Sequence, residues 1–297
     1  GGPALREAIS GLYTAVGPDG ILVHAGAEEA IFLLMHAALG TGDHVVVHWP
    51  CYQSLAEVPT SIGCDVSPWR AREEAGWAPD IGELWKLVKR RTRMIVLNSP
   101  HNPTGWHARL EELREVVHLC EDRGITLLSD EVYRGSEYRA EDRLPAACDL
   151  STSAVSLGVV SKTYGLPGLR IGWLASRNAA LLSRTAELKD YTTICASAPS
   201  ELLAEVALRH AEELAERSRG IIAANLELLD GFFERHRDEV RWVRPTAGPI
   251  AFPRLLSGDV DAFCEAAADR AGVLLLPGSV YAETAEHFTT GFGRKTM

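Results

Sequence analysis

Short apolar runs alternate with helix-like segments along the first part of this chain, and that alternation restricts its fold more than any other feature. The runs occupy residues 21–24, 44–48, 62–69, 93–97, 125–129, 154–160 and 171–175. Segments with helical spacing of apolar residues lie between or before them, at 4–16, 27–39, 80–90 and 110–123. Buried strands that alternate with helices predict an α/β fold with a mainly parallel central sheet and flanking helices.

The pattern changes beyond Pro199. A long helical stretch is followed by short strands and one further helix, in the order 201–235, 240–243, 250–255, 259–271, 273–276 and 287–292. We therefore predict a large domain at residues 1–215 and a smaller α+β domain at residues 216–297.

Charge and cysteine content exclude several classes of protein. Lys and Arg number 30 against 40 Asp and Glu, and the formal net charge of −10 argues against a nucleic acid or a membrane surface as the partner. The six cysteines are scattered without a CxxC pair, which predicts reduced thiols in a cytoplasmic protein and no metal site. No apolar run approaches the ~18 residues that a membrane span needs, and no signal peptide is recognised at the start.

A loop directly after the 154–160 run carries the most suggestive chemistry. Lys162 follows Ser161 there, and Arg170 lies eight residues further on. A lysine just beyond a strand end can form a Schiff base with a carbonyl compound if its pKa is lowered, and an arginine can hold a phosphate. This pair suggests pyridoxal 5'-phosphate (PLP), although a surface lysine with an ion-paired arginine would explain the same residues.

The turn at 25–27 is a second candidate for phosphate binding. Ala25, Gly26 and Ala27 end one strand and open the next helix, whose free backbone N–H groups and dipole attract anions. An ordinary tight turn has the same sequence. The chain contains no G-x-G-x-x-G or Walker pattern, which makes a dinucleotide or a nucleoside triphosphate a weak alternative.

Three further loops after predicted strands carry polar side chains. Tyr52 is placed to stack on a flat ligand, or else to fill the core, and Asn102 to donate a hydrogen bond, or else to shape its proline-rich turn. Asp130 ends an apolar strand, where a carboxylate needs a positive partner, and Tyr133 follows it. The partner is either a protonated pyridine nitrogen or a structural arginine. His101 has no evident partner in the local sequence, and we assign it no role.

All of these residues fall where a parallel sheet binds ligands, beyond the carboxyl ends of its strands. They also form one chemical set of an amine, an acid, a phenol, a stacking ring, an amide and two phosphate anchors. Alternatives based on the core or on salt bridges do not predict that shared placement.

The chain resembles the class I/II aminotransferases, which are PLP enzymes of fold type I, from residue 1 to residue 297. The resemblance rests on motifs in the order that this family has. They are Gly26-Ala27-Glu28-Glu29-Ala30, Pro50-Cys51-Tyr52, Asn102-Pro103-Thr104-Gly105, Asp130-Glu131-Val132-Tyr133, Ser161-Lys162 with Arg170, and Gly291-Phe292-Gly293-Arg294. It implies an enzyme that moves an amino group between an amino acid and a 2-oxo acid, and it implies a homodimer.

The resemblance also implies a role for each catalytic candidate. Lys162 would form the internal aldimine with PLP and then carry a proton as general acid and base. Asp130 would pair with the pyridine N–H and keep the ring a good electron sink. Tyr133 and Asn102 would hydrogen-bond the phenolic oxygen, with Asn102 also at the substrate.

The remaining cofactor contacts follow in the same way. Tyr52 would stack on the ring, and the backbone N–H groups of Ala27 and Glu28 would hold the phosphate together with Ser161 and Arg170.

Three features depart from the family pattern. The family commonly has an arginine for the substrate carboxylate near Thr289, and this chain has none in that run. Val159 occupies a position that is often serine, so one phosphate contact is expected to be missing. Members of the family also extend further at both ends, which implies that the two predicted domains are incomplete over residues 1–297.

Two other functions remain open at this point. The 161–170 phrase is similar to members that modify arginine, such as capreomycidine synthase, so a PLP enzyme that does not transaminate is the main alternative. A shortened, inactive homologue that serves as a binding subunit is another. Cofactor absorbance separates the last from both enzymes, and formation of a 2-oxo acid separates the enzymes from each other.

Overall fold

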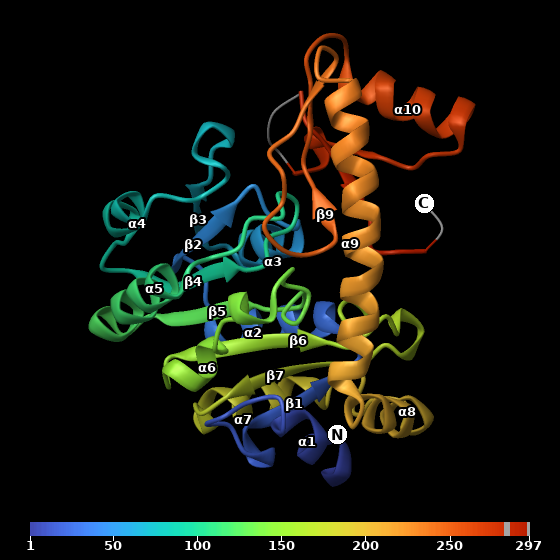
Figure 1. Ribbon diagram of the computed structural model, residues 1–297. Coiled ribbons are helices and arrows are strands. Elements are labelled where there is room, and N and C mark those ends of the chain that lie inside the picture. Colours follow the sequence, from blue (N-terminus) through green and yellow to red (C-terminus); the bar gives the residue numbers. More distant parts are fainter. Residues whose placement is uncertain (282–285, 296–297) are drawn as a thin grey trace.

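A computed structural model, which describes residues 1–281 and 286–295, has a seven-stranded sheet at its centre (Figure 1). The strands are β1 (Ile21–His24), β2 (His44–Trp49), β3 (Asp65–Arg70), β4 (Thr92–Asn98), β5 (Thr126–Asp130), β6 (Ala154–Val159) and β7 (Gly172–Ser176). Their order across the sheet is β1-β7-β6-β5-β4-β2-β3. Strand β7 is antiparallel to both of its neighbours, β1 and β6, and the other neighbouring pairs of this sheet are parallel. The predicted α/β fold with a mainly parallel sheet is confirmed.

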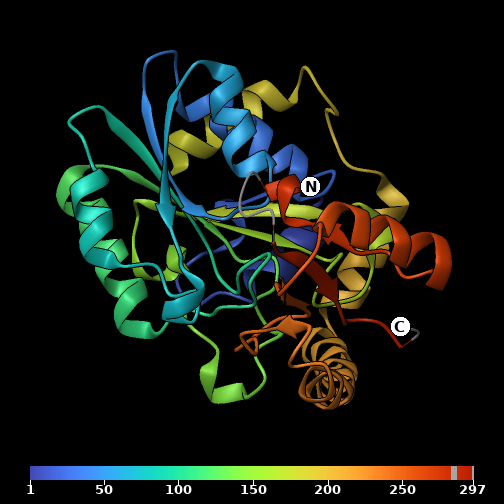
Figure 2. The same ribbon diagram turned by 90° about the horizontal axis from the view of Figure 1, so that it is seen from above.

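Helices cover both faces of this sheet (Figure 2). One face packs against α2 (Ala27–Ala38), α3 (Ser54–Ile62) and α7 (Ala179–Lys189), and the other against α4 (Ile81–Leu87), α5 (Leu110–Arg123) and α6 (Ala147–Leu150). Val45 and Val47 belong to the first core and Val46 to the second, and all three are fully buried. Because both faces are covered, the strands read as continuous apolar runs rather than alternating ones.

Two more helices and a long connection complete the arrangement. Helices α1 (Pro3–Ser10) and α8 (Ala198–Leu208) pack together beside β1 and β7. The single helix α9 (Ala211–Arg235) then runs from the sheet to the last part of the chain (Figure 1). The domain boundary predicted near residue 215 falls inside α9, and the division into two domains stays a prediction.

We call the described residues after α9, 236–281 and 286–295, the C-terminal unit. It contains β8 (Val240–Arg241), β9 (Ile250–Ala251), β10 (Arg254–Leu255), α10 (Val260–Ala271), β11 (Leu276–Pro277) and β12 (Phe288–Gly291). Apolar residues of α9, such as Leu226 and Phe233, pack with Phe288 and Phe292 of this unit. The second half of α9, from Ile222 to Phe233, is therefore part of the core of the C-terminal unit.

Glu73 ties the C-terminal unit to the sheet. It lies in η2 (Glu73–Ala75), has 7% of its surface exposed, and forms ion pairs with Arg241 at 3.3 Å, Arg254 at 3.6 Å and His287 at 3.4 Å. A buried carboxylate requires such partners, so this cluster fixes how the C-terminal unit sits on the sheet.

Several predicted element boundaries were wrong. The helix expected at 4–16 ends at Ser10, and the strand expected at 62–69 begins at Asp65 because α3 extends to Ile62 and Gly63 ends it in a left-handed conformation. The loop expected at 134–153 contains α6, whose Ala147 is fully buried. The strands expected at 250–255 and 273–276 are shorter, since residues 252–253 interrupt the first and the second is β11.

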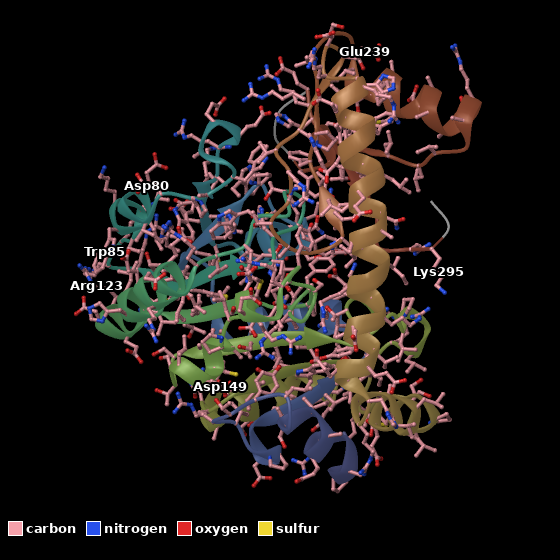
Figure 3. All side chains as sticks on the ribbon, viewed as in Figure 1. Asp80, Trp85, Arg123, Asp149, Glu239 and Lys295 are labelled. Atoms are coloured by element: carbon pink, nitrogen blue, oxygen red, sulfur yellow. The ribbon has the colours of Figure 1, made fainter. Side chains whose placement is uncertain are left out.

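Side chains cover the outside of the fold, and Asp80, Trp85 and Arg123 are among those labelled in Figure 3. Asp80 precedes α4, where its carboxylate accepts the Gly82 N–H at 2.7 Å. The guanidinium of Arg123 lies 5.7 Å from the ring centroid of Trp85 in α4.

Within residues 1–281 and 286–295, no helix has the length and apolarity needed to cross a membrane.

Candidate active site

The loops that follow β2, β4, β5 and β6 leave the sheet at one edge, and they carry Tyr52, Asn102, Tyr133 and Lys162. Charge interactions connect these groups: Asp130 acts on the pKa of Tyr52, Tyr133 and Lys162, and Tyr52 acts on that of Tyr133. The structure thus brings the predicted residues together at the expected edge.

Asp130 is the buried carboxylate of this group. It has 4% of its surface exposed, and among the described residues its carboxylate accepts one hydrogen bond, from the Val132 N–H at 3.2 Å. Burial raises the pKa of Asp130 to about 7, while the Val132 N–H and the Lys162 ammonium oppose the rise. A carboxylate with so little stabilisation is suited to bind a cation or an N–H donor that enters the site.

Lys162 stands above the ring of Tyr133. Its Nζ lies 5.5 Å from the Tyr133 ring centroid, and its side chain is open to solvent. Desolvation by the surrounding protein lowers the pKa of Lys162, and the Arg170 charge lowers it further, whereas Asp130 raises it. A lowered pKa makes the neutral amine available as a nucleophile.

The two tyrosines differ in exposure. Tyr133 has 4% of its surface exposed, and burial raises the pKa of its phenol far above the usual value, so the hydroxyl stays protonated. Tyr52 is 40% exposed, and burial together with a hydrogen bond to Glu28 raises its pKa to about 12. Tyr133 can therefore donate a hydrogen bond inside the site, while the Tyr52 ring remains accessible to a flat ligand.

The predicted phosphate turn has the close packing that an anion cradle requires. Gly26 has φ +93°, and a Cβ at this position would lie 2.6 Å from Nη2 of Arg170. A Cβ on Gly172 would lie 2.7 Å from the backbone N of Ala27. No side chain caps α2, whose first N–H groups belong to Ala27 and Glu28. Glycines thus let Arg170 approach the positive end of α2.

Ser161 and Arg170 also contact each other. Nη1 of Arg170 lies 3.5 Å from Oγ of Ser161 and donates to the Pro167 carbonyl at 3.2 Å. Arg170 itself has φ +53°, a left-handed conformation that is costly for a side chain of this size. Val159, by contrast, has 4% of its surface exposed and packs in the apolar core, so it offers no hydroxyl to an anion.

A buried network fixes the loop that carries Asn102. The Asn102 N–H donates to Oδ1 of Asn98 at 2.7 Å, and the Asn98 amide donates to the carbonyls of Pro100 at 3.1 Å and Asp130 at 3.0 Å. The position of Asn102 is therefore set relative to Asp130 by hydrogen bonds to the backbone.

His101 does have local partners, which corrects the prediction that it has none. Its Nδ1 lies 2.7 Å from the hydroxyl of Thr104, and its ring stacks on His48 at 3.8 Å between centroids. Burial lowers the pKa of His48 to about 3 and that of His101 as well. Both rings are neutral supports beneath the loops of Tyr52 and Asn102.

No local sequence signal pointed to Tyr281, which the structure adds to this group. It ends η5 (Gly278–Tyr281) in the C-terminal unit, and its hydroxyl donates to Oδ1 of Asn102 at 3.5 Å. Its charge interactions reach Tyr52 and Tyr133. No rule about strand ends identifies such a residue, because tertiary packing brings it in from a distant segment.

The last strand carries a neutral residue at the expected arginine position. Thr289 of β12 has 8% of its surface exposed. Arg294 is the nearby cation: it is exposed, and its charge lowers the pKa of Lys162. An ion pair with a substrate carboxylate is therefore not available from residue 289.

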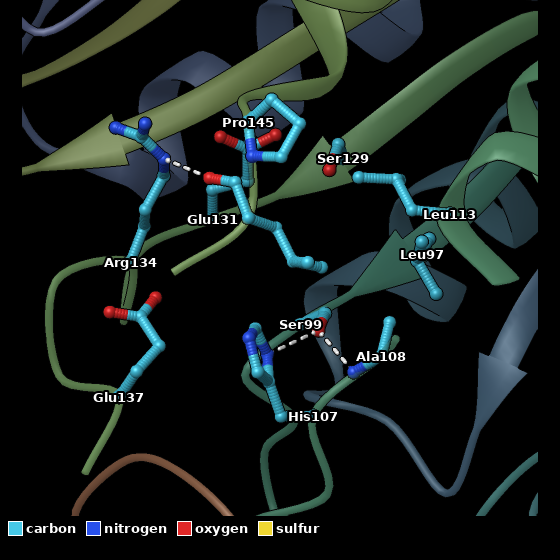
Figure 4. Close-up of a pocket in the computed structure, with 11 residues that line it drawn as sticks. Leu97, Ser99, His107, Ala108, Leu113, Ser129, Glu131, Arg134, Glu137 and Pro145 are labelled. Atoms are coloured by element: carbon cyan, nitrogen blue, oxygen red, sulfur yellow. Dashed lines mark hydrogen bonds between the residues drawn. The ribbon is translucent and has the colours of Figure 1, made fainter. Parts of the chain in front are cut away.

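A separate small pocket lies on the α5 side of the sheet (Figure 4). Glu131 is at its centre and accepts hydrogen bonds from the Ala147 N–H at 2.9 Å and the Ser156 hydroxyl at 2.7 Å. The cavity volume of about 20 Å³ accommodates one water molecule. This pocket is too small for a substrate, and Lys162 is not among the residues that line it.

These groups fit PLP on two observations. Gly26 and Gly172 let Arg170 approach the first N–H groups of α2, which together attract an anion, and the buried carboxylate of Asp130 needs a positive partner such as a pyridine N–H. Across the described stretches, no group of three His, Cys, Asp or Glu side chains is arranged to hold a metal ion. Fold and site together are those of a PLP enzyme.

Comparison with known proteins identifies the family. The model of the aminotransferases of class I and II matches residues 1–297. Capreomycidine synthase of Streptomyces vinaceus is 32% identical over 98% of this chain and 75% of its own length. The chain therefore belongs to the class I and II aminotransferase family, which confirms the resemblance, the PLP cofactor and the enzymatic class.

Two solved structures have the same fold. A PLP-dependent aminotransferase from Streptococcus suis superposes with a TM-score of 0.93 at 35% identity, over 99% of this chain and 77% of the other. The PLP-dependent cyclase OrfR has a TM-score of 0.91 at 35% identity, over 99% and 78%. The same scaffold thus occurs in enzymes named for two different reactions.

Proposed function

We propose that this chain transfers an amino group between an amino acid and a 2-oxo acid, with PLP bound at Lys162. The observation that carries the proposal is the placement of the Lys162 amine over Tyr133, in electrostatic interaction with the buried carboxylate of Asp130. When bound, PLP supplies an electron sink that stabilises negative charge at the Cα of the amino acid.

The chain's own groups would then hold and move protons. Lys162 Nζ, with its lowered pKa, would take a proton from Cα of the amino acid and deliver it to C4′ of the cofactor. Asp130 would keep a positive charge at the pyridine nitrogen, which offsets the cost of its own burial. Tyr133 and the amide of Asn102 would donate to the phenolic oxygen.

The remaining residues would orient the cofactor. Arg170, Ser161 and the first N–H groups of α2, from Ala27 and Glu28, would hold the phosphate. Tyr52 would cover one face of the ring.

The experiment that tests this proposal is an absorbance titration of the purified chain with PLP, followed by borohydride reduction and peptide mass analysis. A visible band that reduction fixes on Lys162 supports the cofactor site. Lys162→Ala should lose the band, and Lys162→Arg, which keeps a positive charge, should lose it too. A band that persists in either variant would contradict the role of Lys162.

Consumption of the band by amino acids then tests the reaction. Amino transfer predicts one 2-oxo acid for each pyridoxamine phosphate formed. Arginine belongs in the panel, together with aspartate, valine and alanine. If none of the amino acids yields a 2-oxo acid although the band forms, transamination is wrong and the cofactor site stands.

A cyclising or otherwise non-transaminating reaction is the second candidate. Similarity to capreomycidine synthase and to the cyclase OrfR favours it, and so does Thr289 at the position expected to bind a carboxylate. A product that keeps its amino group, detected by mass after incubation with arginine, would support this candidate over transamination.

The proposal includes a homodimer in the cytoplasm. Apolar side chains are exposed along the loop after α7 and on α8, with Tyr191 at 89%, Ile194 at 69% and Leu202 at 61% of their surface. Exposed apolar groups in succession support burial against a second copy. Light scattering after gel filtration tests it, with Leu202→Glu expected to shift the mass toward the monomer and Leu228→Glu on α9 as the matched control.

A further inference from the structure

Tyr281 reaches the site from the C-terminal unit, and its hydroxyl has two neighbours. It has 7% of its surface exposed and donates to Oδ1 of Asn102 at 3.5 Å. The Thr289 side chain forms a hydrogen bond with the same phenol, which opposes the rise in pKa that burial causes. The hydroxyl therefore stays protonated and available as a donor to the amide.

The surroundings hold Tyr281 in this position from two sides. Nε2 of Gln53, next to Tyr52 in sequence, donates to the Val280 carbonyl at 2.9 Å. The Tyr281 ring packs edge-on against Phe252 at 5.7 Å, and Phe252 stacks on His287 at 4.9 Å. A ring fixed in this way can impose an orientation on a flexible amide beside it.

The contact between the Tyr281 hydroxyl and Asn102 determines which way the two ends of the Asn102 amide point. Its backbone is fixed by the bond from the Asn102 N–H to Asn98. An asparagine side chain has one accepting oxygen and one donating NH2 group. A hydroxyl that donates to the oxygen leaves the NH2 group on the opposite side, and in the described part of the chain no acceptor binds that group.

We infer that Tyr281 is a positioning residue, which orients Asn102 so that its NH2 group donates to the phenolic oxygen of the bound cofactor. This inference rests on the proposed function. Through Tyr281, the position of the C-terminal unit relative to the sheet then helps to determine the protonation state of the cofactor bound at Lys162.

The sign of the expected effect follows from electrostatics. A donor aimed at a negatively charged oxygen stabilises the deprotonated form and lowers the pKa of the group it touches. Loss of that donor raises the pH at which the visible band changes. An amide that can rotate freely donates for part of the time, so Tyr281→Phe should shift this midpoint by less than Asn102→Ala.

The experiment measures the pH midpoint of the visible band in the PLP-loaded protein. Tyr281→Phe removes the hydroxyl and keeps the ring, and we expect its midpoint to rise by about half a unit, roughly threefold in proton affinity. Tyr138→Phe is the matched control, because its hydroxyl donates to the Gly248 carbonyl at 3.0 Å, in a different loop of the C-terminal unit. Its midpoint should equal that of the wild type.

The double variant with Asn102→Ala shows whether Tyr281 acts through Asn102. In that background, Tyr281→Phe should cause no further shift. A midpoint unchanged by Tyr281→Phe, or a shift that adds fully to that of Asn102→Ala, overturns the inference while the band on Lys162 leaves the proposed function intact. A wild-type protein without the band overturns both.

Discussion

Asp130 and Glu131 are adjacent buried carboxyl groups with different surroundings. Asp130 interacts with Lys162, and the Val132 N–H is its hydrogen-bond donor among the described residues. Glu131 faces the α5 side, where the Ala147 N–H and the Ser156 hydroxyl bind it. Burial raises the pKa of both. Oε2 of Glu131 has no hydrogen-bond partner among the described residues, so the two groups differ in what surrounds them and not in complete satisfaction. Asp130 interacts with the Lys162 amine at a strand end, which marks a binding site, whereas Glu131 holds α6 and β6 together and stabilises the fold.

The largest expected effect comes from Asp130→Asn. The amide keeps the shape of the carboxyl group but cannot stabilise a positive pyridine nitrogen, so we expect the amino-transfer rate to fall by roughly 10²–10³. Steady-state kinetics with saturating PLP measure it. Glu131→Gln is the matched control and should keep its activity. Equal losses in both variants would remove the distinction between the two groups.

A substitution at Glu131 tests whether this residue stabilises the fold. Glu131→Ala leaves the Ala147 N–H and the Ser156 hydroxyl buried without their acceptor, which costs about 3 kcal/mol of unfolding free energy. Urea unfolding without PLP measures it, and Glu131→Gln should lose much less because it keeps an accepting oxygen. Asp130→Asn should not destabilise the chain, and a loss as large as that of Glu131→Ala would contradict this reading of Asp130.

Gly26 extends the comparison to the phosphate cradle. A Cβ at Gly26 would lie 2.6 Å from Nη2 of Arg170, so Gly26→Ala should displace this guanidinium and weaken PLP binding by about tenfold or somewhat more. Gly42→Ala is the control: it has a similar φ of +85° but no heavy atom within 4 Å of the added Cβ. A PLP titration should show normal affinity for Gly42→Ala, and equal weakening in both would indicate backbone strain instead.

Sequence reasoning worked best where local rules decide the structure. It placed β1 and α5 at their observed limits, because an apolar run and a left-handed Gly124 at a helix end are local signals. It also placed the strand-end loops of the candidate site at one edge, since parallel strands share that edge. Their roles at the cofactor stay predictions.

The rest depends on contacts between distant residues. Helix α3 went unrecognised, and the strand expected at 62–69 overlapped its last residue; Pro59 lies inside this helix, where local rules disfavour a proline. Tyr281 enters the site through packing of the C-terminal unit, which no local pattern encodes. The stack of His101 on His48 joins the loop after β4 to strand β2, although α3, β3, α4 and β4 lie between them in the sequence.

Asp130 should also give the stability of the fold a pH dependence. Without PLP, the folded chain keeps the Asp130 proton up to a pKa of about 7, whereas the unfolded chain releases it near the ordinary value of 3.8. The folded state therefore binds more protons between these values, and the unfolding free energy falls as the pH rises through that window, by up to about 1.4 kcal/mol per unit. Urea unfolding at pH 5 and pH 7 should show a decrease of about 2 kcal/mol in unfolding free energy from this group.

The raised pKa of Glu131 acts in the same direction, so two variants must be compared with the wild type. Asp130→Asn should lose the Asp130 part of the pH dependence, and Glu131→Gln should keep it. If Asp130→Asn kept the full slope, Asp130 would already be ionised at pH 5 and would not depend on the cofactor for its partner.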